Sequence, residues 1–202
     1  GNGSPWNREF RDPSAGDNLF LSSIVAVDAA TGTYKWHFQT TQGDNWDYTA
    51  TQTIILADLP VGEDGESRRV AMQAQKNGFF YVLDRKTGEF LSAEKFVVAN
   101  WATHVDYETG RPVERPEADW SNKTTYLTPG PLGGHNWHPM SFSPRTGLVY
   151  IPTSTTIQPF APDPAFEYTV GATNSAVEQV LLVKQLENFL DAINLCNPSH
   201  IT

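Results

Sequence analysis

The stretch "AVDAATGTYKW", residues 26–36, contains a short phrase that the chain repeats. The pattern Asp-x-x-Thr-Gly returns in "VLDRKTGEFLS" (82–92) and "HVDYETGRPVE" (104–114), and "SPRTGLVYI" (143–151) keeps its Thr-Gly. An Asp side chain accepts hydrogen bonds from backbone N–H groups two or three residues further on, and Gly adopts a positive φ without steric cost. Because alternating apolar residues flank the phrase on both sides, each copy predicts a β-hairpin.

Hairpins that recur at irregular intervals are typical of antiparallel sheets stacked as β-propeller blades, with long loops inserted between some strands. We therefore expect an all-β fold, and we expect Trp36 to pack on a neighbouring blade. The composition agrees, since 39% of the residues are hydrophobic, only 18% are charged, and there are 15 Gly and 14 Pro.

The bulk properties exclude several classes of function. A net charge of −9 opposes binding to nucleic acid, and no apolar run is long enough to cross a bilayer. A single cysteine, Cys196, cannot form an intrachain disulfide. The first residues, "GNGSPWNREF", lack the features of a signal peptide, and we expect the chain to be an internal fragment of a longer protein.

The last thirty residues differ from the rest. "SAVEQVLLVKQLENFLDAINL", residues 175–195, has apolar residues at nearly helical spacing and contains neither Pro nor the turn phrase. This pattern predicts a C-terminal amphipathic helix. We accordingly expect a partial propeller domain over residues 1–173 and a divergent helical tail over 174–202.

Two acidic or amide side chains could take part in chemistry. Asp47 lies between Trp46 and Tyr48 in "GDNWDYTATQ" (43–52), where desolvation by the rings would suit a general base. The alternative, which the residues by themselves favour, is a turn in which Asp44, Asn45 and Asp47 bond to the backbone. Asn2 could offer its carbonyl oxygen to a hard cation such as Ca²⁺, or could belong to an Asn-Gly turn.

A lysine and a glycine-rich loop are the other candidates. Lys76 could hold an anionic ligand in a pocket, or could be a solvated charge at a strand edge. The loop "GGHNWHP" (133–139) offers the amide of Asn136 and the flat ring of Trp137 to a ligand. Its two histidines, His135 and His138, suggest zinc, but no third ligand stands at regular spacing.

Taken together and in order, these segments resemble the pyrroloquinoline-quinone (PQQ)-dependent alcohol dehydrogenases of the methanol and ethanol type. The resemblance covers residues 1 to about 173, and the segments that carry it are "GNGSPWN", "GDNWDYTATQ", "QKNGFFYVLDRKTGEFLSAEKF", "NWATHVDYETGRPVE" and "GGHNWHPMSFSPRTGLVYIP". It implies about three four-stranded blades of an eight-bladed propeller that carries PQQ and Ca²⁺ near its axis. It also implies a location in the bacterial periplasm.

The resemblance implies a role for each candidate residue. Asn2 matches a calcium ligand, Asp47 the catalytic aspartate beside the metal, and Lys76 the basic residue that reaches the quinone oxygens. Asn136 and Trp137 match positions that line the cofactor pocket. Thr49 stands where lanthanide-dependent members carry a second Asp, so we expect calcium rather than a lanthanide.

The implied reaction is the oxidation of a primary alcohol to an aldehyde, with Asp47 as general base and a cytochrome c-type protein as electron acceptor. The resemblance leaves open haem c in the parent enzyme and membrane association through partner subunits. Because further ligands and blades would lie outside this chain, we expect the isolated fragment to be inactive. A non-catalytic propeller piece that serves as a binding scaffold is the alternative.

Overall fold

The computed structural model describes residues 5–61, 65–172, 174–178 and 184–194. Within these residues strands dominate, and the short 3-10 helices η1, η2 and η4 accompany them. The elements are η1 (Arg8–Phe10), η2 (Pro13–Ala15), β1 (Ser23–Val27), β2 (Tyr34–Gln39), β3 (Ile55–Pro60), β4 (Ser67–Ala74), β5 (Phe79–Asp84), β6 (Phe90–Lys95), β7 (Ala102–Val105), β8 (Pro112–Glu114), η4 (Pro116–Ala118), β9 (Thr125–Leu127), β10 (Ser141–Ser143), β11 (Leu148–Phe160) and β12 (Lys184–Asn194).

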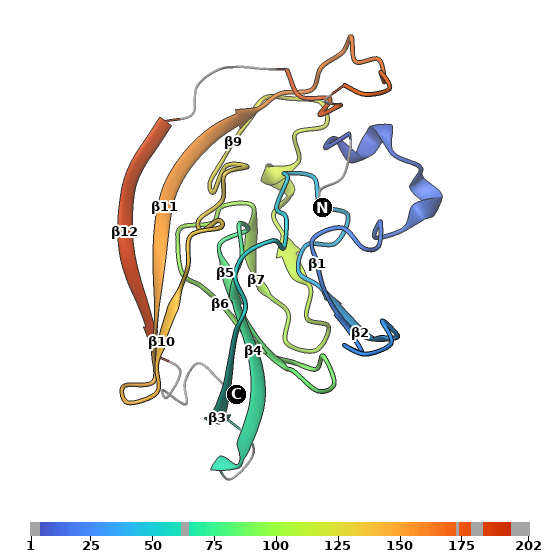
Figure 1. The fold of residues 1–202 in the computed structure, drawn as a ribbon. Helices are drawn as coiled ribbons and strands as arrows, with labels where there is room; N and C mark the ends of the chain where they lie inside the picture. The colour runs from blue at the N-terminus through green and yellow to red at the C-terminus, as the bar shows by residue number, and fades with distance from the viewer. Residues whose placement is uncertain (1–4, 62–64, 173, 179–183, 195–202) are drawn as a thin grey trace.

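The strands form antiparallel sheets that stand beside one another (Figure 1). One sheet has the order β3-β4-β5-β6, and another has the order β10-β11-β12, with β9 also paired to β11. Within the described residues, β1-β2 and β7-β8 form two-stranded hairpins. The predicted all-β architecture of stacked antiparallel sheets is therefore confirmed.

The repeated phrase forms the predicted turns. In each of its complete copies, the Gly N–H donates to the carbonyl oxygen of the Asp at 2.8 Å. The Asp side chain caps the turn as expected, with Asp84 Oδ1 accepting from the Lys86 and Thr87 N–H groups at 2.9 and 3.0 Å. The four glycines have φ values between 67° and 79°. The phrases join β1 to β2, β5 to β6, β7 to β8 and β10 to β11, so all four hairpins are confirmed.

The centre of the β3–β6 sheet is buried on both faces, because β5 contributes side chains to two cores. Phe79 and Tyr81 enter one cluster together with three tryptophans, whereas Phe80 and Val82 enter a second cluster with side chains of β10 and β11. Successive side chains of a strand point to opposite faces, so the nearly continuous apolar run of β5 serves both. This sheet is thereby fixed between its neighbours, and the loops at its ends are fixed with it.

The predicted contact of Trp36 with a neighbouring hairpin is present. A Cβ built on Gly88, in the β5–β6 turn, would lie 2.7 Å from Trp36 Cδ2. The ring thus packs directly against a glycine of the next repeat, and only hydrogen atoms fit between them.

We expect Gly88→Ala to lower the free energy of unfolding by about 2–5 kcal/mol, since a left-handed φ and a clash with the ring combine. The matched control is Gly32→Ala. Gly32 occupies the same position in the first turn, with φ +71° and open space around it. It should lose only about 1–2 kcal/mol. Urea unfolding of both variants measures the difference, and equal losses would show that the ring contact is unimportant.

The predicted C-terminal helix is wrong over the part of it that the structure describes. Residues 184–194 form β12, which pairs antiparallel with β11 from Leu148↔Asn194 to Ile157↔Lys184. A short apolar pattern does not separate helix from strand, and the long edge of β11 offers N–H and C=O groups that need partners. Residues 179–183 and 195 lie outside the described residues, and the boundary at 173/174 stays a prediction. None of the described helices is long and apolar enough to cross a membrane.

Candidate functional site

The backbone turns at Asp47. Asp47 has a left-handed backbone with φ +65°. Trp46 and Tyr48 are fully buried, and their rings stack on each other with centroids 5.7 Å apart. The expectation that Asp47 is held between the two rings is therefore wrong. The turn sends both aromatic side chains into the core, where both also contact Trp101.

The partner of the Asp47 side chain is Lys76. Lys76 Nζ lies 3.2 Å from Asp47 Oδ2 and 3.1 Å from the Asp47 carbonyl oxygen. The two side chains are only 10% and 16% exposed. Lys76 follows the end of β4, and its burial rules out the alternative of a solvated strand-edge charge. A partly desolvated carboxylate beside an ammonium group is the kind of pair that functional sites use.

The glycine-rich loop packs on Lys76. The Gly134 N–H donates to the Lys76 carbonyl oxygen at 3.0 Å. A Cβ on Gly133 would lie 2.6 Å from Lys76 Cα, so a larger residue would not fit there. The loop that was predicted to bind a ligand is therefore anchored beside the Asp47–Lys76 pair.

Several side chains of this loop have partners in or near the loop. Asn136 Nδ2 donates to the Leu132 carbonyl oxygen at 2.9 Å. Trp137 is 71% exposed, and its ring stacks on His138. Their predicted contact with a cofactor stays a prediction. Both ring nitrogens of His135 face backbone carbonyl oxygens, of Ala74 and His138, which supports a structural role and not zinc binding.

Asn2 lies outside the described residues. Among the residues that the structure does describe, no three His, Cys, Asp or Glu side chains gather as a metal site. Of the predicted site residues, the structure thus brings together Asp47 and Lys76, and it places the loop of Asn136 and Trp137 next to Lys76.

Tyr48 ties the Asp47 segment to the segment that precedes the glycine-rich loop. Its hydroxyl donates to the Pro129 carbonyl oxygen at 2.5 Å. Burial raises the pKa of Tyr48 far above its ordinary value of 10, and burial also raises the pKa of Tyr81. The sequence gives no sign of the contact between Tyr48 and Pro129, because it joins residues far apart in the chain.

We expect the free energy of unfolding to fall as the pH rises above about 10, because the unfolded chain then loses phenol protons that the folded chain keeps. Each buried tyrosine contributes a slope of about 1.4 kcal/mol per pH unit until its own folded pKa is reached. Tyr48→Phe should remove one such contribution. At neutral pH it should also cost about 1–3 kcal/mol, because the Pro129 carbonyl loses its partner. Urea unfolding between pH 8 and about pH 11 measures both effects; an unchanged alkaline slope would contradict the assignment.

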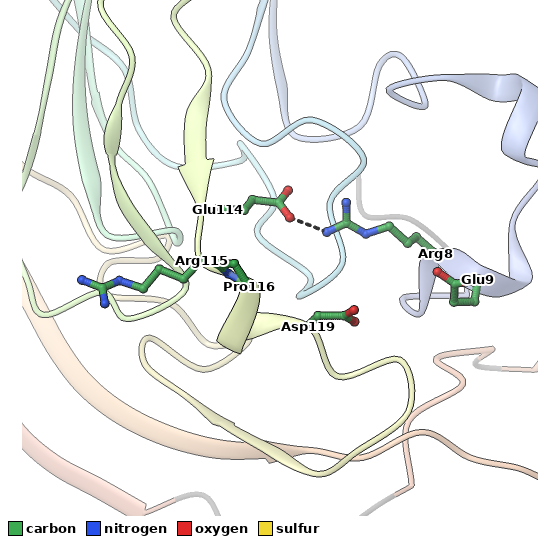
Figure 2. Close-up of a pocket in the computed structure, with 6 residues that line it drawn as sticks. All are labelled: Arg8, Glu9, Glu114, Arg115, Pro116 and Asp119. Carbon is green, nitrogen blue, oxygen red and sulfur yellow. Dashed lines mark hydrogen bonds and ion pairs between the residues drawn. The ribbon is translucent and has the colours of Figure 1, made fainter.

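A charged cavity lies beside Arg8. It has a volume of about 280 Å³ and is lined by Arg8, Glu9, Glu114, Arg115, Pro116 and Asp119. Figure 2 shows Arg8 facing Glu114, at 2.8 Å, while Arg115 points away from it. The Arg8 guanidinium lies over the Trp46 ring at 5.4 Å, which connects the cavity with the Asp47 segment. Sequence reasoning missed this cavity, since its residues come from separate segments.

Comparison with known proteins shows which proteins share the segments that carry Asp47 and Lys76. Residues 7–100 match the family described as glucose/ethanol/alcohol dehydrogenase, beta-propeller domain, a PQQ family. The chain is 59% identical, over 152 residues, to the quinohemoprotein alcohol dehydrogenase ADH IIB of Pseudomonas putida. Over about three quarters of its length, the chain is thus similar to the quinohemoprotein alcohol dehydrogenases. The match covers 75% of the chain but only 22% of that relative, so the chain spans about a fifth of its length.

Solved structures of alcohol dehydrogenases share the fold. The quinohemoprotein alcohol dehydrogenase of Comamonas testosteroni superposes with a TM-score of 0.86 and 45% identity, over 96% of this chain and 30% of the other. A europium-containing methanol dehydrogenase superposes with a TM-score of 0.78 and 32% identity, over 94% of this chain and 36% of the other. The stacked sheets described above thus share their fold with part of the β-propeller of these enzymes.

The donor set of the site fits both groups that the family implies. PQQ is an anionic quinone, and Lys76 offers it a partly buried ammonium group. An ammonium has three donors, of which two point to Asp47 oxygens, so one is left for a quinone oxygen. The Asp47 carboxylate is the type of ligand that Ca²⁺ prefers. Lys76 and Asp47 would therefore hold the quinone and the metal, respectively.

Proposed function

We propose that this chain supplies the Asp47–Lys76 part of the active site of a PQQ- and calcium-dependent alcohol dehydrogenase, which oxidises primary alcohols to aldehydes. The observation that carries the proposal is the ion pair between Lys76 Nζ and Asp47 Oδ2, at 3.2 Å in a partly buried position. Because the glycine-rich loop packs directly on Lys76, it helps to hold the pair in place.

Asp47 accepts the hydroxyl proton of the alcohol. A carboxylate can do this only from hydrogen-bond distance, and its orientation therefore decides the rate. Lys76 keeps the Asp47 side chain in one orientation through two contacts, one to the carboxylate and one to the backbone carbonyl. When bound, the quinone supplies the hydride acceptor and the metal polarises its carbonyl.

We assign calcium as the metal. Thr49 is neutral at the position where lanthanide-dependent members carry a second aspartate. A site with fewer negative ligands favours a divalent over a trivalent ion. Asn2 would add a neutral amide oxygen to the same ion, and Asn136 and Trp137 would line the quinone pocket.

The resemblance also supports a cellular location and an electron acceptor for the enzyme. We infer a periplasmic location, a cytochrome c-type electron acceptor, and membrane association through partner subunits. The name of the relative ADH IIB, a quinohemoprotein, supports haem c in the complete enzyme. The net charge of −9 argues against a nucleic acid partner.

The competing proposal is a non-catalytic propeller piece that binds other molecules. The charged cavity beside Arg8 and Glu114 favours it, because a ligand could enter there. A scaffold, however, needs only the turn phrases and gives no reason for a partly buried Lys76–Asp47 pair.

A segment exchange tests the proposal. Residues 1–173 replace the matching segment of the Comamonas testosteroni enzyme, and the purified chimera receives PQQ with Ca²⁺ or with Eu³⁺. We expect quinone absorbance, and we expect aldehyde formation coupled to dye reduction with Ca²⁺ but far less with Eu³⁺. A folded chimera that binds PQQ and forms no aldehyde would overturn the proposal. A chimera that binds no PQQ would favour the scaffold.

A further inference from the structure

Asp44 is a buried carboxylate that the proposed reaction does not use. The residue is 1% exposed and stands three positions before Asp47. Burying a charge is costly unless hydrogen bonds compensate it, so a buried carboxylate calls for a structural or functional reason. Asp28, by contrast, caps an exposed turn.

The backbone around Asp47 wraps around the Asp44 carboxylate. The Trp46 N–H donates to Asp44 Oδ1 at 3.0 Å, and the Tyr48 N–H also donates to this carboxylate. Asp44 thus receives the N–H groups on both sides of Asp47. A left-handed φ in a residue other than Gly is strained, and these two hydrogen bonds hold Asp47 in that conformation.

Ser22 closes the arrangement from another segment. Its hydroxyl lies 2.8 Å from Asp44 Oδ2 and also contacts the Tyr48 carbonyl oxygen. Arg11 adds positive charge, because its guanidinium donates to the Asp44 carbonyl oxygen. The carboxylate thus accepts hydrogen bonds from its own segment and from Ser22 of another segment.

Burial and hydrogen bonding have opposite effects on the pKa of the Asp44 carboxyl group. Burial raises the pKa of its carboxyl group above the ordinary value, whereas the N–H groups of Trp46 and Tyr48 and the Ser22 hydroxyl lower it. The hydrogen bonds thus favour the ionised form at the same position where burial opposes it.

We propose that Asp44 is the positioning residue of the site: by binding the backbone on both sides of Asp47, it sets the direction of the Asp47 carboxylate toward Lys76. The inference rests on the proposed function for its catalytic consequence. Its structural part concerns only residues of this chain.

The structural part is tested in the 202-residue chain by acetylation of Lys76 without any cofactor. When Asp44 is lost, Asp47 should leave Lys76, and the Lys76 amine should become more reactive. Mass spectrometry gives the labelling rate of Lys76 relative to Lys35, a more exposed lysine paired with Asp28. Asp44→Ala should raise this ratio by about 5- to 30-fold, with Asp44→Asn in between, because Asn keeps one acceptor oxygen.

The control is Asp28→Ala, which removes a carboxylate that likewise accepts two backbone N–H groups, but in the exposed β1–β2 turn. After normalisation to a further lysine, Lys123, it should leave Lys76 labelling unchanged. If Asp44→Ala fails to fold, Ser22→Ala keeps the test open, since it removes only the hydroxyl that bridges Asp44 and Tyr48. Unchanged Lys76 labelling in folded Asp44→Asn and Ser22→Ala would overturn the proposal.

The catalytic part is tested in the PQQ- and calcium-loaded chimera. Asp44→Asn should lower kcat by about 10²-fold through misplacement of Asp47, with a much smaller change in KM for the alcohol. An unaltered kcat in an active chimera would reject the positioning role. An inactive unsubstituted chimera would instead reject the proposed function, and the Lys76 labelling result would stand by itself.

Discussion

Asp47→Asn should lower kcat for a primary alcohol by about 10²–10⁴-fold in the PQQ- and calcium-loaded chimera. Asparagine has nearly the same shape but cannot accept the hydroxyl proton at neutral pH. It also leaves the Lys76 ammonium, 10% exposed, without its charged partner. We expect this second effect to lower the free energy of unfolding by about 1–3 kcal/mol, so the fold should survive.

Stopped-flow or steady-state dye reduction measures kcat, and circular dichroism checks the fold. Asp28→Asn is the matched control, because Asp28 caps an exposed turn in the β1–β2 hairpin. It should keep the kcat of the unsubstituted chimera. Near-normal turnover in folded Asp47→Asn would remove Asp47 from the reaction.

Of the substitutions that add one methyl group to the glycine-rich loop, Gly133→Ala should be the most destabilising. Gly133 has φ +84°, and a Cβ there would lie 2.6 Å from Lys76 Cα and 2.7 Å from the His135 carbonyl oxygen. Both are backbone atoms, which cannot move aside as a flexible side chain would. We expect a loss of about 2–5 kcal/mol in the free energy of unfolding, together with displacement of Lys76 from Asp47.

Gly171→Ala separates the clash from the backbone strain. Gly171 has a similar φ of +79° but open space around it, so only the strain of about 1–2 kcal/mol should appear. Urea unfolding gives both values. If the two variants lose the same amount, the contact between the loop and Lys76 is looser than the structure shows.

The fold was largely predictable from local chemistry. The Asp-x-x-Thr-Gly phrase specifies a turn through its own side chain and its own glycine, so it forms the same hairpin wherever it occurs. The prediction of a C-terminal helix was wrong because local chemistry does not decide there. The apolar pattern of residues 184–194 permits helix or strand, and pairing with the edge of β11 decides between them.

The site was predictable only in part. Resemblance singled out Asp47 and Lys76, and the structure brings them to 3.2 Å. The sequence argument placed Asp47 between the rings of Trp46 and Tyr48. The left-handed backbone of Asp47 instead sends both rings into the core, away from the carboxylate. Asp44 and the cavity next to Arg8 went unnoticed as functional candidates. Their environment is built by Ser22, Glu114 and other distant segments, which no local pattern records.

The bond from the Tyr48 hydroxyl to the Pro129 carbonyl oxygen crosses 81 residues of chain. A protein engineer who grafted only the ten residues "GDNWDYTATQ" onto a foreign scaffold would carry over the carboxylate and lose the anchor that holds its neighbour. Transplanting this chemistry therefore requires at least the partner segment as well, and the smallest portable unit is far larger than the motif suggests.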